Sequence, residues 1–276
     1  MPIPESSQPD AFKAFEHERW QSAARVYNDA FVRLTSQVVD SLLDAVGARP
    51  GIRLLDMASG PGQIAARAAE RGATVTGSDF SAEMVALARE LQPGVDFRVA
   101  DAEALPFGDA SFGAVTMGFL LGHLPRPAVA IREAFRVLRP NGRIALSWWL
   151  PPGQSLAFAI MKDAIAAHGR TEVGLPPAPP FELFSRAPVL REVLGEAGFT
   201  SIDVREVAMT WRLASAHEMF DAYRDGTART AGLLRLQTPE ALDAIRAEVV
   251  KRCEPWLTGN GLELAMPAWV ASGTKS

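Results

Sequence analysis

The stretch Leu-Leu-Asp-Met-Ala-Ser-Gly-Pro-Gly-Gln-Ile-Ala, residues 54–65, decides the fold. A short apolar run ends in an acid, a Gly-Pro-Gly turn follows, and a helix of small residues begins near Gln63. Glycines in such a turn let the backbone approach a ligand closely, and the start of the helix supplies free amide donors. The stretch therefore predicts a strand–turn–helix unit that binds a small molecule where the strand ends.

The spacing of the glycines fits two kinds of ligand. Residues 60–65 match the dinucleotide pattern Gly-x-Gly-x-x-Ala, whose turn binds a pyrophosphate. Asp56 argues against that ligand, because a carboxylate four residues before Gly60 would repel it. The same carboxylate suits a ligand that carries an ammonium and a sulfonium group. A strand-end aspartate that merely caps the turn is the structural alternative.

Outward from this stretch, short apolar runs alternate with amphipathic segments. Residues 81–91, for example, place Met84 and Leu87 on one helical face. Such alternation predicts an α/β fold of three layers, in which helices cover both faces of a parallel sheet. We expect a helical region over residues 12–46 and helices over 63–71, 81–91, 127–138 and 188–197. We expect strands over residues 52–57, 73–77, 95–99, 114–119, 143–150, 201–213 and 262–271.

The flanks of this core are expected to enclose its ligand site. Residues 1–50 predict an N-terminal helical lid, and residues 51–276 predict the main domain. Residues 151–184 contain six prolines and are too long for an ordinary connection, which predicts a functional loop or lid. Residues 216–260 look largely helical. The two late segments together predict a cap over the carboxyl edge of the sheet.

The composition limits the partners and the location of the protein. The 28 Lys and Arg against 32 Asp and Glu leave a net charge of -4, which disfavours nucleic acid. One cysteine, Cys253, excludes an internal disulfide and any site built from several cysteines. No apolar run is long enough for a membrane span, and the start does not read as a secretory signal. We expect a cytoplasmic protein, whose oligomeric state the sequence leaves open.

Two further acids follow the next predicted strands. Asp79 stands where a carboxylate can accept hydrogen bonds from both ribose hydroxyls, and Phe80 beside it could pack on an adenine face. Asp101 ends the third strand, where it could accept the adenine amino group while the Ala102 amide donates to a ring nitrogen. Each acid could instead be an ordinary loop residue, and Asp79 would also serve a nicotinamide dinucleotide. The series indicates a nucleoside.

These segments together resemble class I S-adenosylmethionine-dependent methyltransferases, nearest the small-molecule branch of ubiquinone and menaquinone biosynthesis. The likeness covers residues 50–150 well and the flanks loosely. It implies a Rossmann-like, mostly parallel sheet of seven strands whose last strand is antiparallel, with a helical cap. It also implies S-adenosyl-L-methionine as cofactor and S-adenosyl-L-homocysteine as product. The matching segments are LLDMASGPGQIA (54–65), VTGSDFS (75–81), DAEALPF (101–107), FGAVTMGFLLGHLPRP (112–127) and RVLRPNGRIALSWW (136–149).

The resemblance also implies where the cofactor lies. Asp56 and Gly60 would lie near its methionine part, and Met117-Gly118 on its other side. Tyr27 occurs where helices ahead of such a core often reach the cofactor carboxylate, although a tyrosine of the core is equally compatible. The expected cofactor-binding residues are Tyr27, Asp56, Ala58, Gly60, Gly62, Asp79, Phe80, Met84, Asp101, Ala102, Met117 and Gly118.

Departures from the family pattern affect the choice of a general base. Gly113 replaces a common aspartate and Asn141 a common glycine, changes that should leave cofactor binding intact. Many members have two histidines where this chain has Gly122-His123, which weakens an inherited base. His123 is nevertheless the best-placed catalytic candidate, or else it anchors its loop. A base is needed only if the acceptor must lose a proton.

Other side chains could also face the acceptor. His168 in the proline-rich segment and His217 in the late helical segment are two such candidates. Strand alternation should send one of Trp148 and Trp149 into the core and the other toward the active edge. An aromatic wall for the acceptor and ordinary core packing are both compatible with this pair.

The acceptor is expected to be a small, apolar organic molecule, methylated at carbon, oxygen or nitrogen. Residues 116–121 lack the Asn/Asp-Pro-Pro-aromatic motif of enzymes that methylate amino groups of nucleic acids and glutamine. The acid cluster of a catechol-type magnesium site is also missing, so no metal is expected. Two alternatives remain. One is a non-methylating user of the fold, a cyclase or a cofactor-binding subunit, and the other is an NAD-type oxidoreductase.

Overall fold

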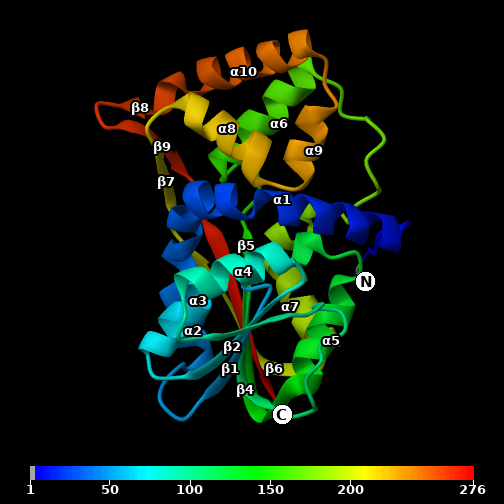
Figure 1. Ribbon diagram of the computed structural model, residues 1–276, viewed down its shortest axis with the longest axis vertical. Helices are drawn as coiled ribbons and strands as arrows, with labels where there is room; N and C mark the ends of the chain where they lie inside the picture. The colour runs from blue at the N-terminus through cyan, green and yellow to red at the C-terminus, as the bar shows by residue number, and fades with distance from the viewer. Residues whose placement is uncertain (1–3) are drawn as a thin grey trace.

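A twisted sheet of seven strands runs through the centre of the computed structural model, which describes residues 4–276 (Figure 1). Its strand order is β3-β2-β1-β4-β5-β10-β6, and only β10 runs antiparallel to its neighbours. The predicted mostly parallel sheet with an antiparallel last strand is therefore confirmed. The strands are β1 (Arg53–Met57), β2 (Thr74–Asp79), β3 (Asp96–Val99), β4 (Phe112–Gly118), β5 (Leu138–Trp149), β6 (Phe199–Val207) and β10 (Ala268–Lys275).

Helices cover both faces of this sheet. In Figure 1, α2 and α3 lie on one side of it and α5 and α7 on the other, which gives the three layers. Local signals start two of these helices: Ser81 accepts a hydrogen bond from the Met84 amide at the start of α4, and Pro127 occupies the first turn of α5. The bounds are α2 (Val39–Val46), α3 (Gln63–Glu70), α4 (Ala82–Leu91), α5 (Pro127–Val137) and α7 (Ala187–Glu196).

The expected strands over 201–213 and 262–271 are each two strands, so both expectations were wrong. The first segment passes from the central sheet into a second, antiparallel sheet of order β7-β9-β8, and the last segment passes from that second sheet into the central one. Pro267 explains one break, because it has no amide hydrogen with which to continue the ladder. The Met266 amide donates to the Met209 carbonyl, 2.9 Å away, so the two segments lie side by side where they pass between the two sheets. The strands are β7 (Thr210–Leu213), β8 (Leu257–Thr258) and β9 (Gly261–Ala265).

Five more helices gather beyond the carboxyl edge of the central sheet. Figure 1 shows α6, α8, α9 and α10 above this edge, with α1 crossing between them and the sheet. The loop expected over 151–184 contains one of them, α6, because Ile160, Ala164 and Ile165 repeat at helical spacing and are buried. The bounds are α1 (Pro9–Thr35), α6 (Leu156–His168), α8 (Ala216–Gly226), α9 (Arg229–Arg235) and α10 (Pro239–Cys253). Short 3-10 helices span Ser36–Val38, Leu121–His123, Phe181–Ser185 and Glu254–Trp256.

None of the helices between residues 4 and 276 combines the length and the apolar composition that a membrane crossing requires. Residues 1–3, the first part of the expected lid, lie outside the described residues.

The contact between β2 and β3 is tight enough to be tested. A Cβ atom on Gly77 would lie 2.4 Å from Cδ1 of Phe97, whose side chain is 1% exposed and cannot move aside. We expect Gly77→Ala to lower the free energy of unfolding by about 1–3 kcal/mol, because overpacking forces the neighbours apart. Urea unfolding measures this change.

Gly94→Ala is the matched control. A Cβ atom there meets no atom of the described chain within 4 Å, so its effect should stay within about 0.5 kcal/mol. Equal midpoints for the two variants would contradict the packing described for Gly77.

Candidate active site

A cavity of about 390 Å³ lies between the carboxyl ends of the central strands and the helices above them. It is the kind of concave, mostly apolar site that binds small molecules, at the edge where α/β sheets bind their ligands. From the sheet side it is lined by Ala58, Gly60, Asp79, Phe80, Asp101, Ala102 and Gly118. From the helical side it is lined by Trp20, Tyr27, Phe31, Phe158, Tyr223 and Arg229, and Met84 of α4 also lines it.

Most of the expected cofactor-binding residues, together with His123, line this cavity. Asp56, Gly62 and Met117 instead lie beneath it. Strand alternation turns Met117 into the core while Gly118 faces the cavity. Gly62, at a φ of +90°, packs against Phe97, whose Cζ atom lies 2.6 Å from where a Cβ would be. The expected residues that line the cavity are Tyr27, Ala58, Gly60, Asp79, Phe80, Met84, Asp101, Ala102, Gly118 and His123.

The Asp79 carboxylate joins the turn after β1 to the start of α4. Its Oδ2 accepts from the Gly60 amide and its Oδ1 from the Ser81 amide, both at 2.9 Å. The side chain is nearly buried, and this burial raises its pKa to about 6. The carboxylate therefore holds the glycine turn in place and still borders the cavity.

Asp56 is fully buried one strand away. Its Oδ1 accepts a hydrogen bond from the Thr116 hydroxyl at 2.8 Å, while its Oδ2 has no partner among residues 4–276. Burial, with a contribution from the negative charge of Asp79, raises its pKa to about 7. The Ser59 hydroxyl and the Gln63 amide oxygen are likewise buried without a partner in the described chain. Such unpaired atoms are rare, and their gathering around this turn fits a polar cofactor bound there.

Helix α1 is fastened across the ends of β2 and β3. Lys13 forms ion pairs with Asp101 and with Glu103, the latter at 3.1 Å. The amide oxygen of Gln21 accepts from the Ser81 hydroxyl at 2.6 Å and from the Glu83 amide at 3.0 Å. The helix thus contacts the same sheet edge to which the sequence assigns the adenosine part of the cofactor.

The same helix supplies a partner for His123 that the sequence analysis missed. Glu16, only 1% exposed, places Oε2 3.0 Å from Nδ1 of His123, and the same oxygen accepts from Nε1 of Trp20 at 3.0 Å. A carboxylate only accepts, so a neutral His123 has its proton on Nδ1 and a free lone pair on Nε2. The only sequence signal for this contact was that Glu16 and Trp20 lie about one turn apart on the predicted helix. An acid exposed to solvent on a helix would show the same spacing, so the sequence did not single out Glu16.

The other two histidines considered in the sequence lie away from the cavity wall. His168 is 3.7 Å from Glu248 of α10, and His217 is an exposed residue of α8. The pair of tryptophans divides as strand alternation predicted. Trp149 lines the cavity, whereas Trp148 is fully buried and donates to the Phe181 carbonyl at 3.1 Å.

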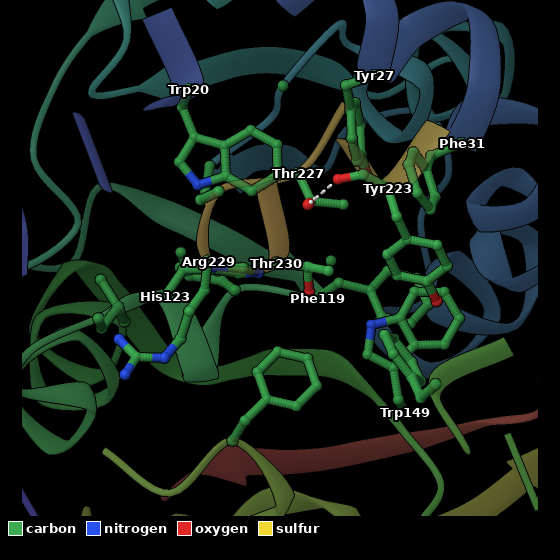
Figure 2. Close-up of a pocket in the computed structure, with 18 of the residues that line it drawn as sticks. Trp20, Tyr27, Phe31, Phe119, His123, Trp149, Tyr223, Thr227, Arg229 and Thr230 are labelled. Carbon is green, nitrogen blue, oxygen red and sulfur yellow. Dashed lines mark hydrogen bonds between the residues drawn. The ribbon is translucent and has the colours of Figure 1, made fainter. Parts of the chain in front are cut away.

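Aromatic rings line much of the cavity (Figure 2). On α1, the rings of Tyr27 and Phe31 stack at 5.7 Å, and nearer the sheet Phe119 stacks on Trp149 at 4.1 Å. Figure 2 shows Tyr27, Phe31, Tyr223 and Trp149 following one another along one side of the pocket. Flat apolar surfaces of this kind favour a flat apolar ligand.

Comparison with known proteins identifies the central part of the chain. Residues 55–146 match the family model described as a methyltransferase domain. Demethylmenaquinone methyltransferase of Beutenbergia cavernae is 43% identical over 110 residues, which are 40% of this chain and 46% of that protein. The chain thus spans about half the length of such relatives. The resemblance to class I S-adenosylmethionine-dependent methyltransferases of the ubiquinone and menaquinone branch is confirmed, and S-adenosylmethionine is the cofactor of this domain type.

Solved structures extend the likeness in fold to the whole chain. The 4+2 cyclase SpnF superimposes with a TM-score of 0.61 at 21% identity, covering 100% of this chain and 98% of that one. A putative methyltransferase from Bacillus halodurans gives a TM-score of 0.58 at 21% identity, covering 86% of this chain and 98% of that one. At this level of identity the likeness establishes the Rossmann-like fold.

The buried carboxyls make stability depend on pH. A carboxyl whose pKa rises from 3.8 to about 7 on folding binds more protons in the folded state, so stability falls as pH rises through that window. We expect the ligand-free protein to lose on the order of 2 kcal/mol through Asp56 between about pH 5 and pH 7.5. Asp56→Asn should lose correspondingly less, as measured by urea unfolding at both pH values.

Asp243→Asn, at an exposed position on α10, should keep the pH dependence of the wild type. An Asp56→Asn variant with the same pH dependence as the wild type would show that this carboxyl is not protonated in the folded protein.

Proposed function

We propose that this chain, whose residues 55–146 form a methyltransferase domain, transfers a methyl group from S-adenosylmethionine to a small apolar molecule built on a flat ring. One observation supports this most directly. The strand-end residues expected to bind the nucleoside and the aromatic residues of the helical side line a single cavity of about 390 Å³. Cofactor and acceptor would therefore meet inside one enclosed space.

The residues of the sheet edge fit the cofactor. We assign Asp79 to the ribose hydroxyls, Phe80 to a face of the adenine, and Asp101 with the Ala102 amide to the adenine edge. Buried Asp56, whose Oδ2 has no partner among residues 4–276, lies beneath the turn where the methionine end is expected, and a positively charged methionine end would favour its ionised form. When bound, S-adenosylmethionine supplies a methyl group made electrophilic by the sulfonium.

The helical side would position the acceptor and exclude water. Methyl transfer is an in-line displacement, so holding the acceptor close to the methyl group and aligned with it is the main task of the protein. The stacked rings of Tyr27 and Phe31, and of Phe119 and Trp149, offer flat apolar surfaces against which a flat ring can pack. The name of the Beutenbergia relative, demethylmenaquinone methyltransferase, supports a quinone-type ring.

His123 and Glu16 are proposed to remove a proton when the acceptor must lose one. The free Nε2 lone pair of His123 would take the proton, and the Glu16 carboxylate at Nδ1 would stabilise the resulting charge. This role applies to methylation of a hydroxyl group or of a ring carbon. In this proposal Glu16 is the residue that orients the base, His123.

A second reading keeps the cofactor pocket without methyl transfer. SpnF, which shares the fold along the whole chain, is named a cyclase. An apolar cavity of this kind could also fold a flexible substrate against itself. The two readings differ in whether label from the methyl group of S-adenosylmethionine reaches the acceptor.

Cofactor binding tests the assignment of the sheet edge. We expect calorimetric titration to show binding of S-adenosylmethionine and S-adenosylhomocysteine, and none of NAD. Asp79→Asn should weaken both adenosyl ligands by about tenfold or more, because charge-assisted hydrogen bonds to the ribose are lost. Asp243→Asn serves as the exposed control and should bind as the wild type does. Binding of NAD alone would overturn the proposed function.

Methyl transfer tests the pair of His123 and Glu16. With methyl-labelled S-adenosylmethionine and 1,4-naphthohydroquinone as probe acceptor, His123→Ala should transfer roughly 100-fold more slowly. Glu16→Gln should also slow transfer, because the imidazole loses the carboxylate that orients it. A loss under about threefold for His123→Ala would make this histidine structural. Binding of S-adenosylhomocysteine without any transfer would favour the cyclase reading.

A further inference from the structure

The phenol of Tyr223 closes the cavity from the side of α8. Its ring contacts Phe31 of α1 at 5.7 Å and Phe158 of α6 at 6.0 Å, so it links the aromatic residues of α1 to those near Trp149. Trp211 of β7 packs behind it at 5.8 Å. Figure 2 shows the phenol between Phe31 and Trp149. A ring bound against these aromatic residues would therefore lie next to Tyr223.

The hydroxyl of this phenol is unpaired. It is buried, the side chain is 1% exposed, and the oxygen has no hydrogen-bond partner among residues 4–276. The neighbouring rings of Phe31 and Phe158 have no lone pair to offer, and the Trp211 N–H already donates to the Ala30 carbonyl at 3.2 Å. A buried hydroxyl without a partner destabilises a protein, whereas phenylalanine would fill the same space without that penalty.

Function is one reason for an oxygen to occupy a position where packing alone favours hydrocarbon. We propose that the Tyr223 hydroxyl donates a hydrogen bond to an oxygen bound to the ring of the acceptor, and so selects oxygenated rings over plain hydrocarbons. This inference rests on the proposed function, since it concerns the acceptor side of the same cavity.

Two further properties of the site agree with the donor role. Burial raises the pKa of Tyr223 well above its usual range, so its proton stays in place to be donated. The aromatic sides contribute area but little direction, and a single polar group in such a pocket fixes the orientation of the ligand. A pocket that donates a hydrogen bond also rejects analogues that lack the matching oxygen, because its own group is then left unpaired.

Tyr223→Phe tests the proposal with a matched pair of probes. 1-Tetralone carries one carbonyl on a fused ring, and tetralin is the same skeleton without the oxygen. With the protein saturated with S-adenosylhomocysteine, we expect the wild type to bind 1-tetralone more tightly than tetralin. In Tyr223→Phe the Kd of 1-tetralone should rise at least about fivefold, while that of tetralin should stay within about twofold. Calorimetry or quenching of tryptophan fluorescence measures both.

The ligand-free variant supplies an independent readout. Removing an unpaired hydroxyl should leave the Tm unchanged or raise it, whereas removing a hydroxyl that serves the fold would lower it. A lower Tm would contradict the proposal, as would a wild type that binds both probes equally or a variant that loses affinity for both alike. Failure of the proposed function would show differently, as absent binding of S-adenosylhomocysteine or absent methyl transfer, because the probe titrations require no transfer.

Discussion

The hydrogen bonds from the Gly60 and Ser81 amides to the two oxygens of Asp79 fix the sheet edge that borders the cavity. They join the turn after β1 to the first turn of α4, so two separate strand ends become one rigid edge. The same carboxylate borders the cavity and is therefore available to a ligand. Its burial has an energetic cost, visible in its raised pKa, which a bound partner with hydroxyl donors would offset.

The second organising element is α1, which belongs to the first part of the chain yet serves the centre of the cavity. Lys13 and Gln21 attach it to the sheet edge, and Glu16 between them reaches His123. Its aromatic residues Tyr27 and Phe31 then form one side of the space for the acceptor. A single helix thus contacts the proposed nucleoside side, the proposed base and the acceptor side, and its position couples them.

Sequence reasoning was strongest where local pattern and family motif coincide. The order of strands and helices between residues 52 and 150 follows from periodicity, and alternation correctly separated Trp148 from Trp149. It was weakest where the outcome depends on contacts between distant segments. Glu16 resembles any helical acid until His123 is placed beside it, and the unpaired hydroxyl of Tyr223 is visible only in three dimensions. Pro267 did offer a local signal for the split of the last strand.

The small sheet of β7, β9 and β8 has a consequence for how such enzymes diversify. Leu213 pairs with Leu262, so the chain leaves the sheet for α8, α9 and α10 and returns to a neighbouring position. These helices, which carry Tyr223 and Arg229, form an insertion whose two ends are joined by the backbone hydrogen bonds between β7 and β9. Its helices pack mainly against α1 and α6 rather than against the glycine turn or Asp79. Evolution, or a designer grafting the segment from a relative, could thus alter the proposed acceptor side while keeping the proposed cofactor side.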